Sequence, residues 1–245
     1  MGGCETLVSL SGIDEERFGV RTARAVNVTG AALADVLRFC AENGVGLLIA
    51  RCLCSDAGAA QAMEDHGFRL MDTLVYYARD LAGIPLPVDT GTIPVRPLRE
   101  GEAISVQRVA AEAFRGYRGH YHADPRLDEG LCDQAYVSWA YRSCACPGVA
   151  DQVLVADRDG IVAFATLRVR GQEEGEGVLF GVAPAAQGRG VYRSLMIRAM
   201  EWFSSRGLRR MLVSTQVTNV SVQKVWVRLG FEPTHSQYTF HKWFD

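Results

Sequence analysis

Residues 177–195 read GVLFGVAPAAQGRGVYRSL, and this stretch decides the fold. Val178–Val182 is a short apolar run that predicts a buried strand, and Pro184 ends it because proline has no N–H to give to a sheet. From Val191 onward, apolar residues recur at the spacing of an amphipathic helix, and Gly207 is a natural end for it. The predicted order is therefore strand, glycine-containing turn, helix.

The turn holds the sequence Gln187-Gly188-Arg189-Gly190. Its two glycines allow backbone dihedrals that side chains forbid, and they let a ligand approach the backbone closely. A helix N-terminus also offers free N–H groups and the positive end of the helix dipole, which favour a phosphate or pyrophosphate. An anion site and an ordinary surface turn are both compatible with these residues alone.

The pattern V-x-P-x-x-Q-G-R-G-V resembles motif A of the GNAT acyltransferases, which reads Q/R-x-x-G-x-G/A. Gln187 and Gly190 match its first and fourth positions, whereas Tyr192 stands at the sixth, where the family usually has Gly or Ala. The resemblance implies acetyl-CoA (acyl-CoA) as co-substrate, no metal, and an oxyanion contact from the N–H of Val182. The cofactor-binding residues that it implies are Phe180, Gly181, Val182, Gln187, Gly188, Arg189, Gly190, Val191, Tyr192, Asn219 and Trp226.

The proton carrier is less clearly marked. The family's general acid is a tyrosine four residues before a Gly-Phe pair, and this position is Trp226, whose indole N–H is not a practical proton source. The irregular stretch FRGYRGHYHADPRLDEG, residues 114–130, crowds ionisable and aromatic groups, although an ordinary solvated loop is the alternative. The candidate catalytic residues are His122, Tyr121, His241 and Tyr238.

Composition excludes several classes of protein. The chain has 245 residues, 48% of them hydrophobic, and a formal net charge of -2, so a sizeable core is expected and no nucleic-acid footprint is visible. No apolar run approaches the ~20 residues of a membrane helix, and the N-terminus lacks the pattern of a secretory signal, so we expect a cytoplasmic location. Seven cysteines, an odd number, argue against a disulfide framework.

The chain divides at the proline- and glycine-rich segment 82–92. On each side of it, a glycine is followed at the same distance by a Gly-Phe pair: Gly44 precedes Gly67, and Gly207 precedes Gly230. This indicates an internal repeat of a helix–strand–helix–strand unit. We predict a degenerate half-GNAT-like domain over residues 1–89 and an N-acetyltransferase domain over 90–245. The first domain is expected to pack against the second, to form a dimer contact or to form a wall of the site.

Periodicity and turn signals place the remaining elements. Strands are expected within 20–28, 46–50, 68–81, 93–98, 153–156, 161–169 and 211–213. Helices are expected within 29–43, 57–66, 102–114, 133–142 and 219–229, and 171–177 is expected to be a polar turn. With the resemblance, the predicted fold class is α/β (α+β), a GNAT fold with a central mixed sheet flanked by helices.

The resemblance further implies transfer of an acetyl group to a primary amine. The residues Thr215, Gln216 and Asn219, with the truncated first unit, resemble the TDP-fucosamine acetyltransferase-like two-domain members, which implies a nucleotide-linked amino sugar as acceptor. Two alternatives stay open. One is acylation of an antibiotic or another small amine from a non-acetyl donor, and the other is a CoA-binding module without transferase activity.

Overall fold

The computed structural model describes residues 5–244, which form one mixed sheet flanked by helices, as predicted. The strands are β1 (Leu7–Leu10), β2 (Thr22–Val26), β3 (Leu47–Leu53), β4 (Arg69–Asp80), β5 (Val95–Pro97), β6 (Gln152–Asp157), β7 (Ile161–Arg170), β8 (Glu174–Val182), β9 (Arg210–Gln216) and β10 (Glu232–Trp243). The helices are α1 (Gly12–Phe18), α2 (Leu33–Glu42), α3 (Ala57–Asp65), α4 (Ala103–Ala113), α5 (Glu129–Ala145), the 3₁₀ turn η1 (Pro184–Ala186), α6 (Val191–Ser204) and α7 (Val220–Arg228).

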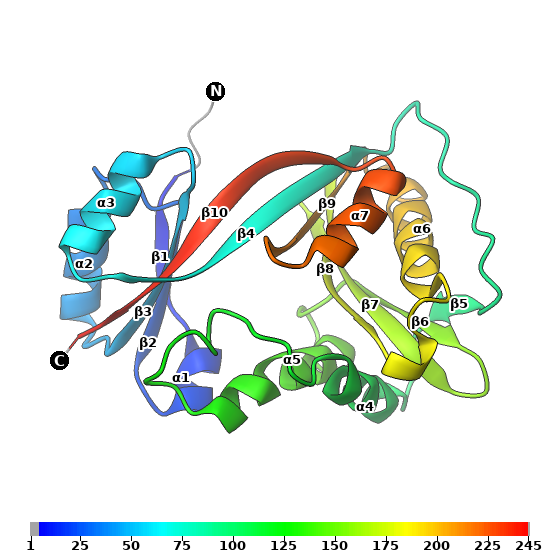
Figure 1. Ribbon diagram of the computed structural model, residues 1–245, viewed down its shortest axis with the longest axis horizontal. Coiled ribbons are helices and arrows are strands. Elements are labelled where there is room, and N and C mark those ends of the chain that lie inside the picture. Colours follow the sequence, from blue (N-terminus) through cyan, green and yellow to red (C-terminus); the bar gives the residue numbers. More distant parts are fainter. Residues whose placement is uncertain (1–4, 245) are drawn as a thin grey trace.

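The two halves of the chain exchange strands in the middle of the sheet. The strand order is β1-β2-β3-β10-β4-β9-β8-β7-β6-β5. The last strand, β10, therefore lies between β3 and β4 of the first half, while β4 pairs antiparallel with β9 of the second half. Both β4 and β10 are long strands that run between the two ends of the molecule (Figure 1). Neither half of the sheet is complete without a strand from the other.

Helices cover both faces of this sheet (Figure 1). On one face, α6 and α7 enclose a core that includes Leu195, Met200 and Trp226, and α2 and α3 enclose another that includes Met63. On the opposite face, α4 and α5 pack against β7 and β8, and α1 packs beside α5. None of the helices within residues 5–244 is both long and apolar enough to cross a membrane.

The two Gly-Phe pairs form equivalent helix ends. Gly67 and Gly230 have φ angles of +77° and +79°, a left-handed conformation that favours glycine. In each case the N–H of the following phenylalanine donates to a carbonyl five residues earlier, from Phe68 to Met63 and from Phe231 to Trp226. The spacing noticed in the sequence therefore corresponds to the same helix-ending turn in both halves.

Several boundaries differ from the sequence prediction. Strand β8 begins at Glu174, inside the segment predicted to be a turn, because its polar residues are stabilised by cross-strand pairs: Glu176 with Arg170 at 2.6 Å and Glu174 with Arg210 at 3.6 Å. Helix α5 begins at Glu129 because the Asp128 side chain accepts from the N–H of Leu131. The elements β1 and α1 were not predicted.

Candidate functional site

The glycine turn has the geometry of an anion site. Gly188 and Gly190 have φ angles of +73° and +77°, and a Cβ added to either would meet no atom within 4 Å, so the left-handed backbone faces open space. Within residues 5–244, no backbone acceptor engages the N–H groups of Gly188 to Tyr192. The first helical hydrogen bond is donated by the N–H of Ser194 to the carbonyl of Gly190. These N–H groups without a backbone acceptor, from Gly188 to Tyr192, lie at the N-terminus of the long helix α6.

An open strand edge lies directly before the turn. The parallel pair β8–β9 is hydrogen-bonded only from Glu174–Gly177 to Arg210–Val213. Beyond that point the strands separate, so Leu179–Val182 pairs with β7 on one side and with no strand on the other among the described residues. An extended ligand arm could therefore add to this edge in the manner of a further strand.

The other cofactor candidates surround this edge. The side-chain amide of Gln187 donates from Nε2 to the carbonyl of Val182 at 3.1 Å and so joins the turn to the strand end. Gly181 is needed for packing, because a Cβ there would come 2.4 Å from the ring of Phe164. Asn219 precedes α7 without capping it, since its amide donates to Thr215 Oγ1 at 3.0 Å.

Aromatic side chains fill the space between the starts of α6 and α7. Trp226 is buried and donates from its indole N–H to the hydroxyl of Tyr192 at 2.9 Å. The rings of Phe180 and Tyr192 are 5.4 Å apart. Tyr192 is thus turned toward α7 and not toward the exposed N–H groups of the turn.

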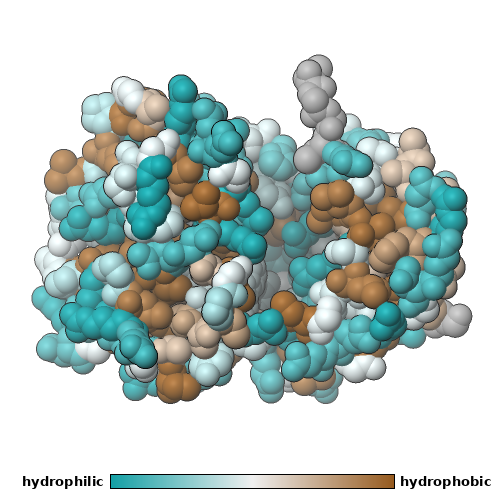
Figure 2. All heavy atoms as spheres, turned by 180° about the vertical axis from the view of Figure 1, so that it is seen from behind, coloured by the Kyte–Doolittle hydropathy of each residue, from teal (hydrophilic) through white to brown (hydrophobic). Residues whose placement is uncertain are grey.

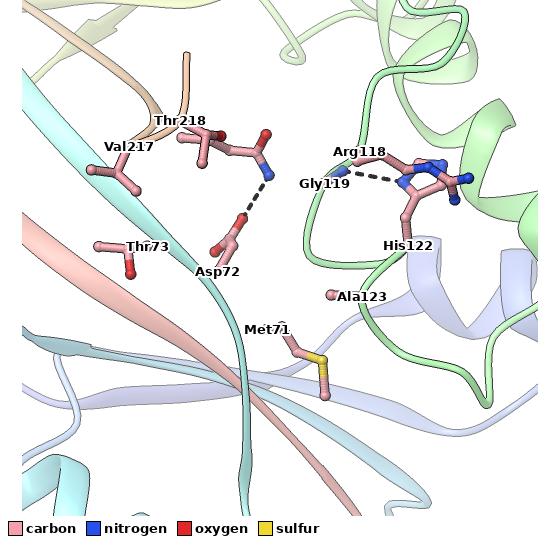
Figure 3. Close-up of a pocket in the computed structure, with 10 residues that line it drawn as sticks. Met71, Asp72, Thr73, Arg118, Gly119, His122, Ala123, Val217 and Thr218 are labelled. Atoms are coloured by element: carbon pink, nitrogen blue, oxygen red, sulfur yellow. Dashed lines mark hydrogen bonds between the residues drawn. The ribbon is translucent and has the colours of Figure 1, made fainter. Parts of the chain in front are cut away.

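A cavity of about 400 Å³ lies beside the two middle strands of the sheet, β4 and the end of β9. Seen from behind, the molecule is also hollowed between its two ends, with hydrophilic and hydrophobic side chains mixed along the hollow (Figure 2). The cavity is lined by β4, by the end of β9 and by the loop between α4 and α5 (Figure 3). Its lining residues are Met71, Asp72, Thr73, Arg118, Gly119, His122, Ala123, Gln216, Val217 and Thr218.

Among the four candidate catalytic residues, His122 alone lines this cavity. Its Nδ1 accepts from the N–H of Gly119 at 3.2 Å, so the proton of the neutral ring is on Nε2, which donates to Asp133 at 3.0 Å. Both ring nitrogens are therefore engaged. Proton transfer from His122 to a ligand would require the Asp133 contact to open.

Tyr121 is held in a buried cluster away from the cavity. Its hydroxyl donates to Asp14 Oδ1 at 2.7 Å and contacts Arg24, which also binds Asp14. Burial raises the pKa of Tyr121 to about 12. Burial alone would raise the pKa of Asp14, but the Arg24 hydrogen bond and charge lower it below its usual value. This arrangement gives Tyr121 a role in packing α1 against the loop.

His241 belongs to a buried chain of hydrogen bonds. Its Nδ1 donates to Asp124 Oδ2 at 2.7 Å, and its Nε2 lies 2.9 Å from Nδ1 of His120. Because a carboxylate only accepts, the chain is best satisfied with a proton on Nδ1 of each ring. The Trp243 indole also donates to Asp124, at 2.9 Å, so the chain ties β10 to the loop.

Tyr238 lies on the opposite face of the sheet from His241, because side chains alternate along β10. It packs against the cluster of α2 and α3 and its ring is 6.2 Å from that of Phe240. The structure therefore does not bring Tyr238, one of the catalytic candidates named from the sequence, together with His122 or His241.

Sequence reasoning did not single out Asp72 or His120 as site residues. Asp72 is an acidic residue two positions before the apolar run LVYY of β4, and only this contrast in the sequence could have drawn attention to it. Its neighbour in the cavity is Gln216, whose amide donates to Asp72 Oδ2 at 3.2 Å (Figure 3). The pairing of β4 with β9, which brings these two residues together, is a long-range contact.

Comparisons with known proteins agree with this geometry. Residues 112–231 match the model of the acetyltransferase (GNAT) family. A mycothiol acetyltransferase of Beutenbergia cavernae is 29% identical over 192 residues, which cover 74% of this chain and 63% of that protein. The chain thus spans less than two thirds of that relative's length.

Solved structures share the fold. A GCN5-related N-acetyltransferase from Sphaerobacter thermophilus superposes with a TM-score of 0.66 at 16% identity, over 97% of this chain and 76% of that one. A tandem GNAT protein from the clavulanic acid biosynthesis pathway superposes with a TM-score of 0.62 at 14% identity, over 92% and 76%. Residues 112–231 thus resemble the GNAT family of acetyltransferases, the glycine turn lies inside this matched segment, and the solved GNAT structures share the fold of the chain.

Proposed function

We propose that this protein is an N-acetyltransferase that transfers the acetyl group of acetyl-CoA to a primary amine on a small polar molecule. The observation that carries the proposal is the combination of two features: N–H groups at Gly188–Tyr192 without a backbone acceptor in the described residues, and an open strand edge directly before them. An anion and an extended amide-bearing arm are the two parts of a CoA molecule that such features suit.

Each part of this region has a proposed task. The N–H groups of Gly188 to Tyr192 hold the pyrophosphate, with the exposed side chain of Arg189 adding positive charge. The edge Phe180–Val182 pairs with the pantetheine arm, and Asn219 lies beside it. Trp226 binds the hydroxyl of Tyr192, whose ring lies beside that of Phe180 at the open strand edge.

Acetyl-CoA, when bound, would supply an acetyl thioester. A neutral amine nitrogen would form a bond to its carbonyl carbon, the C–S bond would break, and CoA would leave as the thiol with the proton that the amine loses. The N–H of Val182 is the proposed donor to the oxygen that becomes negative during this attack. Free alkylamines are mostly protonated near neutral pH, so a proton must leave before the nitrogen attacks. His122 is the proposed carrier of that proton because it lines the cavity, and its Nδ1 would accept the proton once the contact with the N–H of Gly119 opens. His241 supports the loop from behind through Asp124.

The acceptor is proposed to be an amino sugar or a related polar amine. The cavity's lining includes the hydroxyls of Thr73 and Thr218 and the amide of Gln216, which suit a ligand with several hydroxyl groups. The name of the Beutenbergia relative is also that of a small-molecule acetyltransferase. A nucleotide-linked deoxyamino sugar is the first candidate.

The division into a first unit of 1–89 and a second of 90–245 is part of the same proposal. The shared helix-ending turns at Gly67 and Gly230 support a repeat. Over residues 5–89, the first unit has no glycine turn like that of residues 188–190, so we propose that only the second binds the cofactor.

A thiol-release assay tests the proposal. The protein is incubated with acetyl-CoA and a panel that includes TDP-linked amino sugars, glucosamine and the amine that a mycothiol acetyltransferase acetylates. Amine-dependent thiol release and an acetylated product are expected with at least one amino sugar. Turnover restricted to other amines would reject the sugar assignment, and the absence of turnover with every amine would reject the transferase.

The hydrogen-bonded pair Tyr192–Trp226 favours one second candidate. Since a tryptophan stands at the position of the family's proton-donating tyrosine, the protein could bind CoA without transferring its acyl group. Calorimetry separates the two, because binding of acetyl-CoA with no thiol release for any amine or longer acyl donor supports a binding module.

A further inference from the structure

We infer that Asp72 binds the ammonium group of the acceptor, so that the first half of the chain supplies the recognition of the amine. This inference rests on the proposed function, since it names the residue that holds the second substrate of the same site. It assigns to the half without the glycine turn a direct part in substrate binding.

The placement of Asp72 is set by the exchanged strands. It lies on β4, where it pairs with Thr239 of β10, and it borders the central cavity opposite the loop that carries Arg118 and His122 (Figure 3). Strand β4 also pairs with β9, whose Gln216 and following residues form the adjoining wall. A ligand in the cavity is therefore in contact with strands from both halves.

The two oxygens of the Asp72 carboxylate differ. Oδ2 accepts from the amide of Gln216 at 3.2 Å, which fixes the orientation of the carboxylate. Oδ1 is buried and has no hydrogen-bond partner within residues 5–244. A buried carboxylate oxygen without a donor costs free energy. Asp72 as a whole is half-buried and lines the cavity, so when the Gln216 contact opens and the carboxylate turns toward the cavity, a bound group that donates hydrogen bonds and carries positive charge would stabilise this oxygen.

The cations of the surrounding protein are engaged elsewhere. Arg118 lines the same cavity but pairs with Glu129 at 2.6 Å. The Nε of Arg51 donates to Thr239 Oγ1 at 3.3 Å. Of the described residues, none forms an ion pair with Asp72, which leaves its charge available to a ligand. An ammonium group has three N–H donors and a full positive charge, so it can both donate a hydrogen bond to the carboxylate and balance its charge. A hydroxyl group can only donate the hydrogen bond.

The test compares two sugars that differ at one group. Glucosamine and glucose are titrated by calorimetry, below neutral pH so that the amine is protonated, into the full chain and into its variants. The wild-type protein is expected to bind glucosamine about 10- to 100-fold more tightly than glucose, because a hydrogen bond between charged groups contributes roughly 1.5–3 kcal/mol. Asp72→Asn is expected to reduce this ratio to nearly one.

Asp80→Asn is the matched control, since Asp80 lies at the other end of β4, is exposed and does not line the cavity. It should keep the wild-type ratio. Thermal melting checks folding, and Asp72→Ser replaces Asp72→Asn if that variant is unfolded. The inference is overturned if the wild type binds the two sugars equally or binds neither, or if a folded Asp72 variant keeps the preference. Because binding is read without turnover, a failed thiol-release assay would not be confused with these outcomes.

Discussion

The indole N–H of Trp226 on α7 donates to the hydroxyl of Tyr192 at the start of α6, with 2.9 Å between nitrogen and oxygen. These are the two positions at which the sequence departs from the GNAT pattern, and the structure joins them. Burial raises the pKa of Tyr192 well above its usual value. Trp226 also contacts Tyr77 of β4, with ring centroids 5.4 Å apart. The two departures therefore form one packed unit.

A double-mutant cycle tests that unit. Tyr192→Phe leaves the indole N–H buried without a partner, which should lower the free energy of unfolding by about 1–3 kcal/mol. In Tyr192→Phe combined with Trp226→Phe, both polar groups are gone, so the loss should be smaller than the sum of the single losses by about 0.5–1.5 kcal/mol. Urea unfolding measures all four proteins. Additive losses would show that the hydrogen bond contributes nothing.

Two glycine-to-alanine variants with similar backbone strain test the role of the glycine turn. Gly190→Ala places a side chain at a φ of +77°, which costs about 1–2 kcal/mol, and a methyl group then stands where a pyrophosphate would lie. We expect the KM for acetyl-CoA to rise about tenfold or more. Gly207→Ala, at the other end of α6, has a φ of +76° and equally open surroundings. It should be destabilised to a similar extent and keep its KM. Equal KM values in the two variants would remove the turn from the cofactor site.

Stability should fall in mild acid because of His120. Burial, followed by the charge of His241, lowers the pKa of His120 well below 6.5. The unfolded chain therefore binds a proton that the folded chain resists, so unfolding becomes easier as the pH falls below about 6.5. Arg24, Arg51 and His122 also oppose a charge on His120, and none of them is changed in the test.

His120→Asn removes this titration. Between about pH 7.5 and pH 5.5, its free energy of unfolding should decline less steeply than that of the wild type. Burial also lowers the pKa of His235, but both proteins keep that residue, so the difference isolates His120. Urea unfolding at the two pH values measures it. Parallel declines would contradict the assignment.

The exchanged strands predict that neither half folds alone. A chain of residues 90–245 would leave β10 without β3 and β4 and would expose the edge of β9 that β4 covers. Unpaired edges favour aggregation, so this chain should be insoluble or lack a cooperative unfolding transition. Size-exclusion chromatography and circular dichroism would measure this. A stable monomer with native-like melting would contradict it.

Local features of the fold could be predicted from the sequence. The helix and turn after Val182, the adjacent strands expected within 153–156 and 161–169, and the paired glycine turns all depend on residues close together in the chain, and the structure confirms them. Motif resemblance also drew attention to the region where β8 leaves β9, although the separation of the strands appears only in their pairing.

What could not be predicted depends on contacts between distant residues. Asp14 meets Tyr121, Asp124 meets His241, and Asp72 meets Gln216, and each of these pairs joins segments far apart in the sequence. The exchange of β4 and β10 brings the Asp72–Gln216 pair together. Periodicity can predict that a strand exists, but it does not tell which strand will lie beside it.

A crystal structure of the protein with bound CoA tests the central claim most directly. The pyrophosphate oxygens should lie within hydrogen-bond distance of the N–H groups of Gly188 to Tyr192, with the pantetheine arm along Val178–Val182. Pyrophosphate bound at any other surface, or a protein that takes up no CoA at saturating concentration, would contradict the account.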